Sequence, residues 1–257
     1  MDLRDWWAYR ELLFFLAWRD VQVRYQQTAV GMAWVVLQPL LMTLVFTLVL
    51  GRLAGVPSDG IPYALFACVG LVPWMFFAGA VNQGSSSLVS SAHLISKVYF
   101  PRLLVPAAAV AGRLIDLAVG LVLLGGLMAW YGVALTGGAL MLPVLVLLLA
   151  LLALAVSAAA AALNVRYRDV GLVLPVALQL WMFSSPVLYP SRLVPGRWGW
   201  LYALNPLTGI IDGFRAALLR QSFPWPAVGA SATVILVLLA ASLHAFRRME
   251  DSFADVV

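Results

Sequence analysis

The chain of 257 residues is 63% hydrophobic and only 11% charged, with a formal net charge of +5. A typical soluble domain is about half apolar and about a quarter charged, so this composition excludes an ordinary soluble fold. The basic residues occur singly or in pairs between apolar runs, as they do beside membrane spans, rather than in a nucleic-acid-binding patch. We therefore expect a single all-α polytopic membrane domain over residues 1–257, in contact with membrane lipids and with no nucleic-acid partner.

The first thirty residues (1–30) predict an amphipathic helix at the membrane surface. Apolar side chains recur on one face at three- or four-residue spacing, and polar side chains lie on the other. The apolar face comprises Leu3, Trp7, Phe14, Ala17 and Val21. A plain membrane anchor and a docking helix for a cytoplasmic partner both fit this pattern. Charged residues precede the first long apolar run, so we expect no cleavable signal peptide and a cytoplasmic N-terminus.

Six stretches are apolar enough to span a bilayer, which requires about 20 mostly apolar residues. They cover residues 33–50, 61–82, 106–131, 139–163, 170–189 and 226–246. Six spans put both termini, including the tail 247–257, in the cytoplasm, together with most of the arginines, as the positive-inside rule requires. The first five spans fill residues 33–189.

The region 190–225 precedes the last span and contains Asp212 and Arg215. These two charges near the centre of a span would together cost roughly 5–7 kcal/mol on the insertion scale. The region therefore predicts short re-entrant helices on the periplasmic side, where such backbone is tolerated if it is buried in protein or lines a cavity.

Two predicted spans carry stripes of aromatic and amide side chains near prolines. The candidates are Trp34, Gln38, Met42, Gln179, Trp181, Phe183 and Tyr189. Proline inside a helix leaves a backbone carbonyl without its donor, so such a helix is expected to be buried in protein or to line a wet cavity. Two interpretations remain open: contacts between helices, or the lining of a path for sugars, because rings stack on sugar faces and amides bond hydroxyls.

Arg113 and Asp116 lie three residues apart in the third predicted span and can pair on one helix face. An isolated Arg at such a depth would cost about 2.5–3.5 kcal/mol on the insertion scale, and a neighbouring Asp lowers this cost. A structural pair that joins helices and a role in a transport path are both compatible with the spacing.

Motifs for catalysis and metal binding are missing from the sequence. The only lysine, Lys97, follows the sequence HLIS, so the phosphate-binding loop of ATPases is absent. His93 and His244 each lack a second ligand at metal-binding spacing. We expect no catalytic residue, no metal and no cofactor bound by this chain.

Four blocks occur in order over nearly the whole chain: RYQQTAVGMAWVVLQPLL (24–41), KVYFPRLLVP (97–106), NVRYRDV (164–170) and SSPVLYPSRLVPGRWGWLYALNPLTGIIDGFRAALL (184–219). Together they resemble the membrane subunit of ABC transporters that export lipid-linked polysaccharide, the Wzm-like O-antigen and capsule permeases. Asp212 stands where this family more often has Glu, a departure that keeps the charge.

The resemblance implies a permease of the bacterial inner membrane that forms a homodimer and pairs with two copies of a separate ATPase subunit, which binds ATP and Mg. Its substrate would be a polyprenyl-pyrophosphate-linked polysaccharide, carried through a channel lined largely by the first and fifth spans. Arg24 and Tyr25 at the cytoplasmic mouth are candidates for contacting the pyrophosphate and the first sugars. An ordinary interfacial anchor remains an alternative role for Arg24.

The resemblance also assigns roles to two segments. The periplasmic gate residues would be Trp200, Tyr202, Asn205, Pro206, Asp212 and Arg215, and the residues coupling to the ATPase would be Lys97, Tyr99, Phe100, Pro101 and Arg102. Alternatives are a teichoic-acid or drug exporter of related build, or a multi-pass enzyme acting on polyprenyl-linked sugars. The enzyme would need clustered carboxylates or histidines at a membrane face, and the sequence offers none that is convincing.

Overall fold

The computed structural model describes residues 9–26, 31, 33–97, 100–194 and 196–250, and every regular element in this part of the chain is helical. The main helices are α2 (Arg10–Gln26), α3 (Ala33–Phe46), its π-helical continuation η1 (Thr47–Leu53), α4 (Tyr63–Ser90), α6 (Leu104–Trp130), α7 (Leu142–Arg166), α8 (Val170–Phe183) and α11 (Trp225–Glu250). The short elements are α5 (Ala92–Lys97), η2 (Gly137–Met141), η3 (Ser191–Leu193), η4 (Gly196–Trp198), α9 (Gly199–Ala203) and α10 (Pro206–Leu218).

Among the described residues, five helical stretches are long and apolar enough to cross a bilayer: Ala33–Leu53, Tyr63–Ser90, Leu104–Trp130, Gly137–Arg166 and Trp225–Glu250. They match five of the six predicted spans. The predicted fifth span, 170–189, is too long, because α8 has 14 residues. At 1.5 Å per residue this helix covers about 21 Å, less than the roughly 30 Å of a bilayer core.

The early end of α8 has a local cause. The Ser184 hydroxyl donates to the Leu180 carbonyl at 2.9 Å, and the Ser185 hydroxyl donates to the Trp181 carbonyl at 2.8 Å. Pro186 follows and has no N–H with which to continue the helix. The chain then turns back instead of completing the span that its hydropathy predicted.

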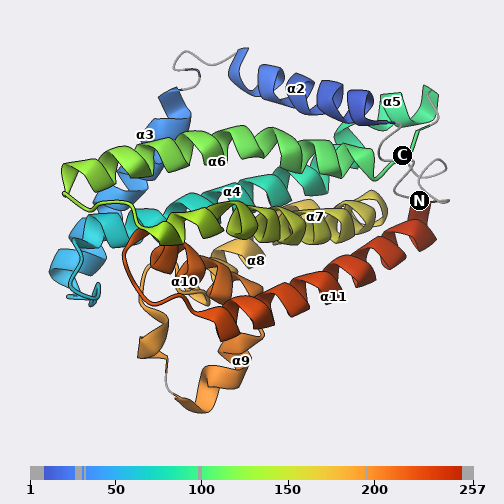
Figure 1. The fold of residues 1–257 in the computed structure, drawn as a ribbon. Helices are drawn as coiled ribbons and strands as arrows, with labels where there is room; N and C mark the ends of the chain where they lie inside the picture. The colour runs from blue at the N-terminus through green and yellow to red at the C-terminus, as the bar shows by residue number, and fades with distance from the viewer. Residues whose placement is uncertain (1–8, 27–30, 32, 98–99, 195, 251–257) are drawn as a thin grey trace.

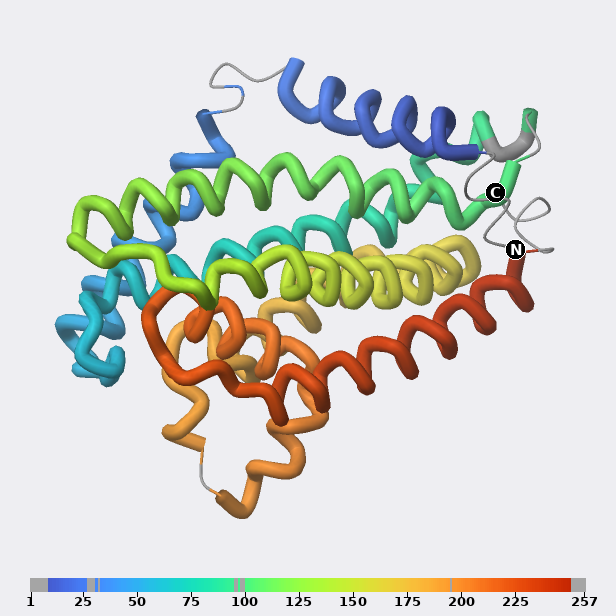
Figure 2. The backbone as a smooth tube through the Cα atoms, viewed as in Figure 1, coloured from blue at the N-terminus to red at the C-terminus, as the bar shows by residue number. Residues whose placement is uncertain are grey.

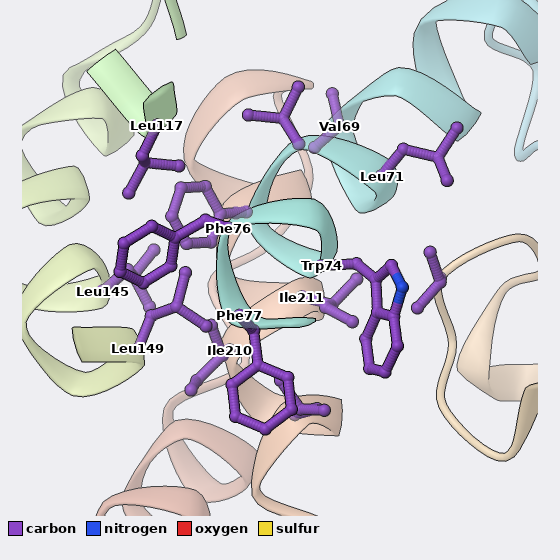
Figure 3. Packing of buried hydrophobic residues seen from close by; sticks show 14 of the residues in the cluster. Val69, Leu71, Trp74, Phe76, Phe77, Leu117, Leu145, Leu149, Ile210 and Ile211 are labelled. Carbon is purple, nitrogen blue, oxygen red and sulfur yellow. The ribbon is translucent and has the colours of Figure 1, made fainter. Parts of the chain in front are cut away.

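Helix α4 lies at the centre of the bundle, packed against α6 and α7, while α11 packs along α7 (Figure 1). The buried side chains of α4 interlock with those of α6, α7 and α10. Figure 3 shows Trp74, Phe76 and Phe77 of α4 among Leu145 and Leu149 of α7 and Ile210 and Ile211 of α10. Helix α10 is buried along nearly its whole length, which fixes it inside the protein.

A second apolar cluster lies where the start of α2, the short helix α5 and the end of α11 come together (Figure 2). It contains Leu88, Phe100, Val165 and Phe246, from four different segments. The two clusters occupy opposite ends of the long helices, so the bundle is packed at both ends.

Helix α2 lies along the outside of α6 (Figure 1). The helices approach closely at Gly112, where an added Cβ would lie 3.2 Å from the Ala17 carbonyl oxygen. Phe14, predicted on the apolar face, is 71% exposed, whereas the neighbouring Leu13 packs against the second cluster.

The packed face of α2 matches the predicted one in part. Val21 is buried and Ala17 meets Gly112 of α6, as predicted, whereas Phe14 is exposed. The face also includes Leu13, Leu16, Asp20 and Arg24. Hydropathy left out Asp20 and Arg24 because they are charged, and they find partners on α4 and α6. Leu3 and Trp7, the other members predicted near the N-terminus, lie outside the described residues.

Candidate transport cavity

A cavity of about 710 Å³ lies between α3, α4, α6 and α8, with the end of α2 beside it. Its walls are largely apolar and include the side chains of Leu71, Val72, Trp74 and Phe76. A small set of polar side chains interrupts these walls: Arg24, Tyr25, Gln38, Asn82, Arg113, Asp116 and Gln179. An apolar cavity with a few convergent polar groups is the usual form of a ligand site.

Most of the predicted channel residues meet at this cavity. Arg24, Tyr25, Trp34, Gln38, Met42, Gln179 and Phe183 line it, together with Arg113 and Asp116. The stripe on α3 and the stripe on α8 therefore face one space.

Trp181 and Tyr189, the other two predicted channel residues, do not line the cavity. Trp181 lies two residues from Gln179 and from Phe183, about 200° around the helix, so it faces the other way. Its Nε1 donates to Asn205 Oδ1 at 3.0 Å, and its ring meets Phe77 edge-on. Tyr189 lies beyond the end of α8, where its hydroxyl donates to the Phe183 carbonyl at 2.9 Å. Neither of these two predicted channel residues therefore faces this cavity.

An ion-pair network joins α2 to α6 at the cavity wall. Arg113 Nη1 lies 3.1 Å from Asp116 Oδ2, within α6. Arg24 Nη1 approaches the same oxygen to 2.5 Å, and the Tyr25 hydroxyl donates to Asp116 Oδ1 at 2.5 Å. Asp116 thus accepts from two guanidinium groups and one phenol.

Gln83 of α4 connects this network to a second ion pair. Its Oε1 accepts from Arg24 Nη2 at 2.7 Å and from Arg113 Nε at 2.9 Å. Its Nε2 donates to Asp20 Oδ2 at 3.3 Å, and Asp20 also pairs with Arg19 at 2.9 Å. Three guanidiniums and two carboxylates leave one net positive charge in the network.

Sequence reasoning missed Gln83, Asn82 and Asp20. The pair NQ at 82–83, set in an otherwise apolar span, was a usable signal, because amides inside membranes normally have protein partners. The partners of Gln83 were not readable, since they lie 30, 59 and 63 residues away in the chain.

Tyr25 lies at the end of α2, outside the spanning helices. Burial, reinforced by the hydrogen bond to Asp116, raises the pKa of its phenol. The hydroxyl therefore keeps its proton at neutral pH and acts as a donor to the anion beside it.

Several predicted gate residues are linked where α8 ends and α10 begins. Asn205 caps α10, with its Oδ1 accepting from the Leu207 N–H at 3.1 Å, and Pro206 occupies the first helical position. The Asn205 Nδ2 donates to Ser185 Oγ at 2.8 Å, which ties the end of α8 to α10. Tyr202 donates to the Tyr189 hydroxyl at 2.9 Å, whereas Trp200 on α9 is exposed.

Arg215 of α10 is only 2% exposed and holds the segment that follows α8. Its Nη2 donates to the Val187 carbonyl at 2.9 Å, and its Nη1 donates to the Tyr189 carbonyl at 3.3 Å. The guanidinium lies 3.8 Å over the Phe66 ring and 3.5 Å from Asp212 Oδ1. The predicted gate residues Asp212 and Arg215 are thus an internal pair that anchors neighbouring backbone.

The predicted coupling segment is only partly exposed. Lys97 is exposed at the end of α5, and Tyr99 lies outside the described residues. Phe100, predicted to couple to the ATPase, is 4% exposed within the second apolar cluster, so its ring packs inside its own chain and is not presented to a partner. An aromatic ring beside an apolar surface of its own chain gains more from burial there than from exposure to water.

Pro101 and Arg102 follow Phe100, and Arg102 contacts Glu250 at the end of α11. The Arg102 N–H donates to Glu250 Oε1 at 3.2 Å, and its guanidinium donates to the Glu250 carbonyl. The segment is therefore fastened to the last helix of the chain.

Apolar helices long enough to span a bilayer, enclosing a cavity with charged and amide groups in its wall, define a multi-pass membrane transport protein. The chain belongs to the ABC-2 type transporter membrane family, whose model matches residues 11–219. It is 31% identical over 258 residues to the O-antigen export system permease protein RfbA of Myxococcus xanthus, covering 99% of this chain and 98% of that protein. An O-antigen export system permease protein RfbA of Klebsiella pneumoniae is 23% identical over 248 residues, covering 96% and 95% of the two chains.

Proposed function

We propose that this protein is the channel-forming subunit of an ABC transporter that exports a polyprenyl-pyrophosphate-linked polysaccharide, of O-antigen or capsule type, across the bacterial inner membrane. The observation that carries the proposal is the cavity, in which aromatic and amide side chains from α3 and α8 face an ion-pair network from α2 and α6. Aromatic rings and amides suit sugars, and guanidiniums suit phosphate groups. The full-length similarity to an O-antigen export permease supports the same substrate class.

The driving force is proposed to come from a separate ATPase subunit that binds ATP and Mg. Two permease chains would face each other through the exposed sides of α3 and α8, and each would pair with one ATPase. Lys97 and the neighbouring surface of α2 are the proposed contact with that subunit. Helices α3 and α8 both carry large exposed apolar side chains, such as Leu44 on α3 and Val176 on α8, that are suited to a partner helix or to lipid.

The gate is proposed to lie at the other end of the cavity. Asn205, Pro206, Asp212 and Arg215 fix α10 and the segment after α8. On α9, Tyr202 binds the Tyr189 hydroxyl and Trp200 is exposed beside it. Opening would require movement of α9 and of residues 184–194 relative to the buried α10.

A deletion of the gene tests this function in cells. The proposal predicts finished lipid-linked polymer that accumulates on the cytoplasmic side of the inner membrane, and the composition of that polymer identifies the substrate. Missing polymer, or a truncated precursor, would instead indicate a biosynthetic role and would contradict export.

A further inference from the structure

The carboxylate of Asp116 is bound by several charged and polar donors from two helices. Its two oxygens accept from Arg24 Nη1, Arg113 Nη1 and the Tyr25 hydroxyl, at 2.5 to 3.1 Å. Guanidinium groups bind phosphate oxygens as well as they bind carboxylates, and charge-assisted bonds of this kind are the strong ones. The same donors line the large cavity, so an incoming ligand can reach them.

A second, smaller cavity also borders this carboxylate. It has a volume of about 280 Å³ and is lined by Tyr25 and Asp116 and by the apolar side chains of Ala33, Val35, Val36, Ile115 and Val119. Tyr25, Val35 and Asp116 therefore border both a large cavity with polar and aromatic groups and a small apolar one. A lipid-linked glycan has the same order along its length: apolar chain, diphosphate, sugar.

The charges of the side chains at this site also suit a diphosphate. Arg24, Arg113 and Asp116 together carry one net positive charge. A diphosphate substituted at both ends carries one negative charge on each phosphoryl group. Two guanidiniums neutralise such a group when Asp116 does not compete for them, whereas without any anion they would repel each other in a partly buried site.

We propose that Asp116 is an internal stand-in for the diphosphate of the transported lipid. It holds Arg24, Arg113 and Tyr25 in place in the empty protein and yields them to the diphosphate, with the polyprenyl chain in the small cavity and the glycan in the large one. This inference rests on the proposed function and specifies its headgroup site. Because Asp116 competes with the substrate, it also limits affinity and favours release.

Binding of a long-chain polyprenyl diphosphate to the full-length protein in lipid nanodiscs, measured by native mass spectrometry, tests the inference. Asp116→Asn removes the competing charge and is expected to tighten binding about tenfold, the scale of one lost charge-assisted interaction. Asp20→Asn is the matched control, since it removes the same charge from the network at a position that does not line the cavity. The control is expected to change affinity by less than about twofold.

Asp116→Asn alone leaves the guanidiniums of Arg24 and Arg113 without their shared anion, and a second pair of variants avoids this. Arg113→Gln is expected to weaken diphosphate binding about tenfold. Adding Asp116→Asn to Arg113→Gln is expected to restore much of it, because Arg24 is then released to the ligand. If the double variant binds no tighter than Arg113→Gln, or if a folded Asp116→Asn protein binds the diphosphate more weakly than wild type, the inference is overturned.

Binding of polyprenyl monophosphate and of phosphatidylglycerol, measured in the same way, shows whether the site selects a diphosphate or accepts any lipid phosphate. The proposal predicts that Asp116→Asn tightens diphosphate binding more than it tightens either of these. An equal gain for phosphatidylglycerol would overturn the assignment to a diphosphate and indicate a site for bulk lipid. The gene deletion can trap polymer inside the cell while Asp116→Asn does not favour the diphosphate over the other two lipids. That result would overturn the inference about Asp116 and leave the proposed function in place.

Discussion

Gly70 of α4 lies directly against the backbone carbonyl of Val187, with no room for a Cβ between them. This contact lets the segment after α8 fold back onto the central helix, where Arg215 also binds the Val187 carbonyl. Only glycine allows a backbone to approach so closely.

Gly70→Ala is therefore expected to destabilise the protein by about 1–3 kcal/mol, because a backbone atom rather than a flexible side chain must move. Gly125→Ala on α6 is the matched control, since an added Cβ there meets nothing within 4 Å. Removing a helical glycine should leave stability unchanged or raise it by up to about 1 kcal/mol. Thermal unfolding in detergent measures both, and equal melting temperatures for the two variants would contradict the packing described.

Phe100→Ala is expected to lower the stability of the permease itself, by about 3–5 kcal/mol, because it empties a buried site in the second apolar cluster. Lys97→Ala, at an exposed position on the same segment, should change stability by no more than about 0.5 kcal/mol. Thermal unfolding of each variant, purified without the ATPase, measures these two changes in stability. A stable Phe100→Ala protein that only fails to bind the ATPase would contradict this burial and indicate a direct contact between Phe100 and the ATPase.

Asn205 makes four side-chain hydrogen bonds, two as acceptor and two as donor, that two substitutions can separate. Asn205→Ala removes the α10 cap and the acceptor for Trp181 Nε1, at an expected cost of about 1–2 kcal/mol. Asn205→Asp keeps that acceptor and loses only the donations to Ser185 Oγ and to the Ser184 carbonyl, so it should cost less. Melting temperatures rank the two variants, and the reverse order would show that the cap and the Trp181 acceptor contribute less than a carboxylate beside the Ser184 carbonyl costs.

Arg215→Lys keeps a positive charge and removes the fork that binds two carbonyls. We expect faster hydrogen exchange over residues 187–190 and a loss of about 1–3 kcal/mol, because buried carbonyls lose their donors. Arg197→Lys, at an exposed position in η4, is the control and should leave exchange in this segment unchanged. Unchanged exchange in the Arg215→Lys protein would show that Arg215 does not hold the segment.

The helical membrane class could be predicted from sequence because composition and run length alone decide it. The same signal overestimated the fifth span, since hydropathy does not register that Ser184, Ser185 and Pro186 end a helix locally. It also placed the packed face of α2 only in part: Val21 is buried as predicted, but Asp20 and Arg24 were not expected on that face, because they become favourable there only when Gln83 and Asp116 are present.

The stripes on α3 and α8 were readable because helical periodicity fixes which residues share a face. Their meeting at one cavity was not readable, because it depends on how α4 and α6 pack between them. The burial of Phe100 was likewise hidden, since its neighbours Leu88, Val165 and Phe246 come from segments far apart in the chain.

Photo-crosslinking in living cells tests the central claim, that the cavity is the path of the glycan, most directly. A photoreactive amino acid would replace Gln38, which faces the cavity from α3, and Val237, which is exposed on α11, as control. The account predicts adducts carrying the polysaccharide at position 38 and none at position 237. Adducts missing at position 38 in a strain that still exports the polymer, or equal adducts at both positions, would contradict it.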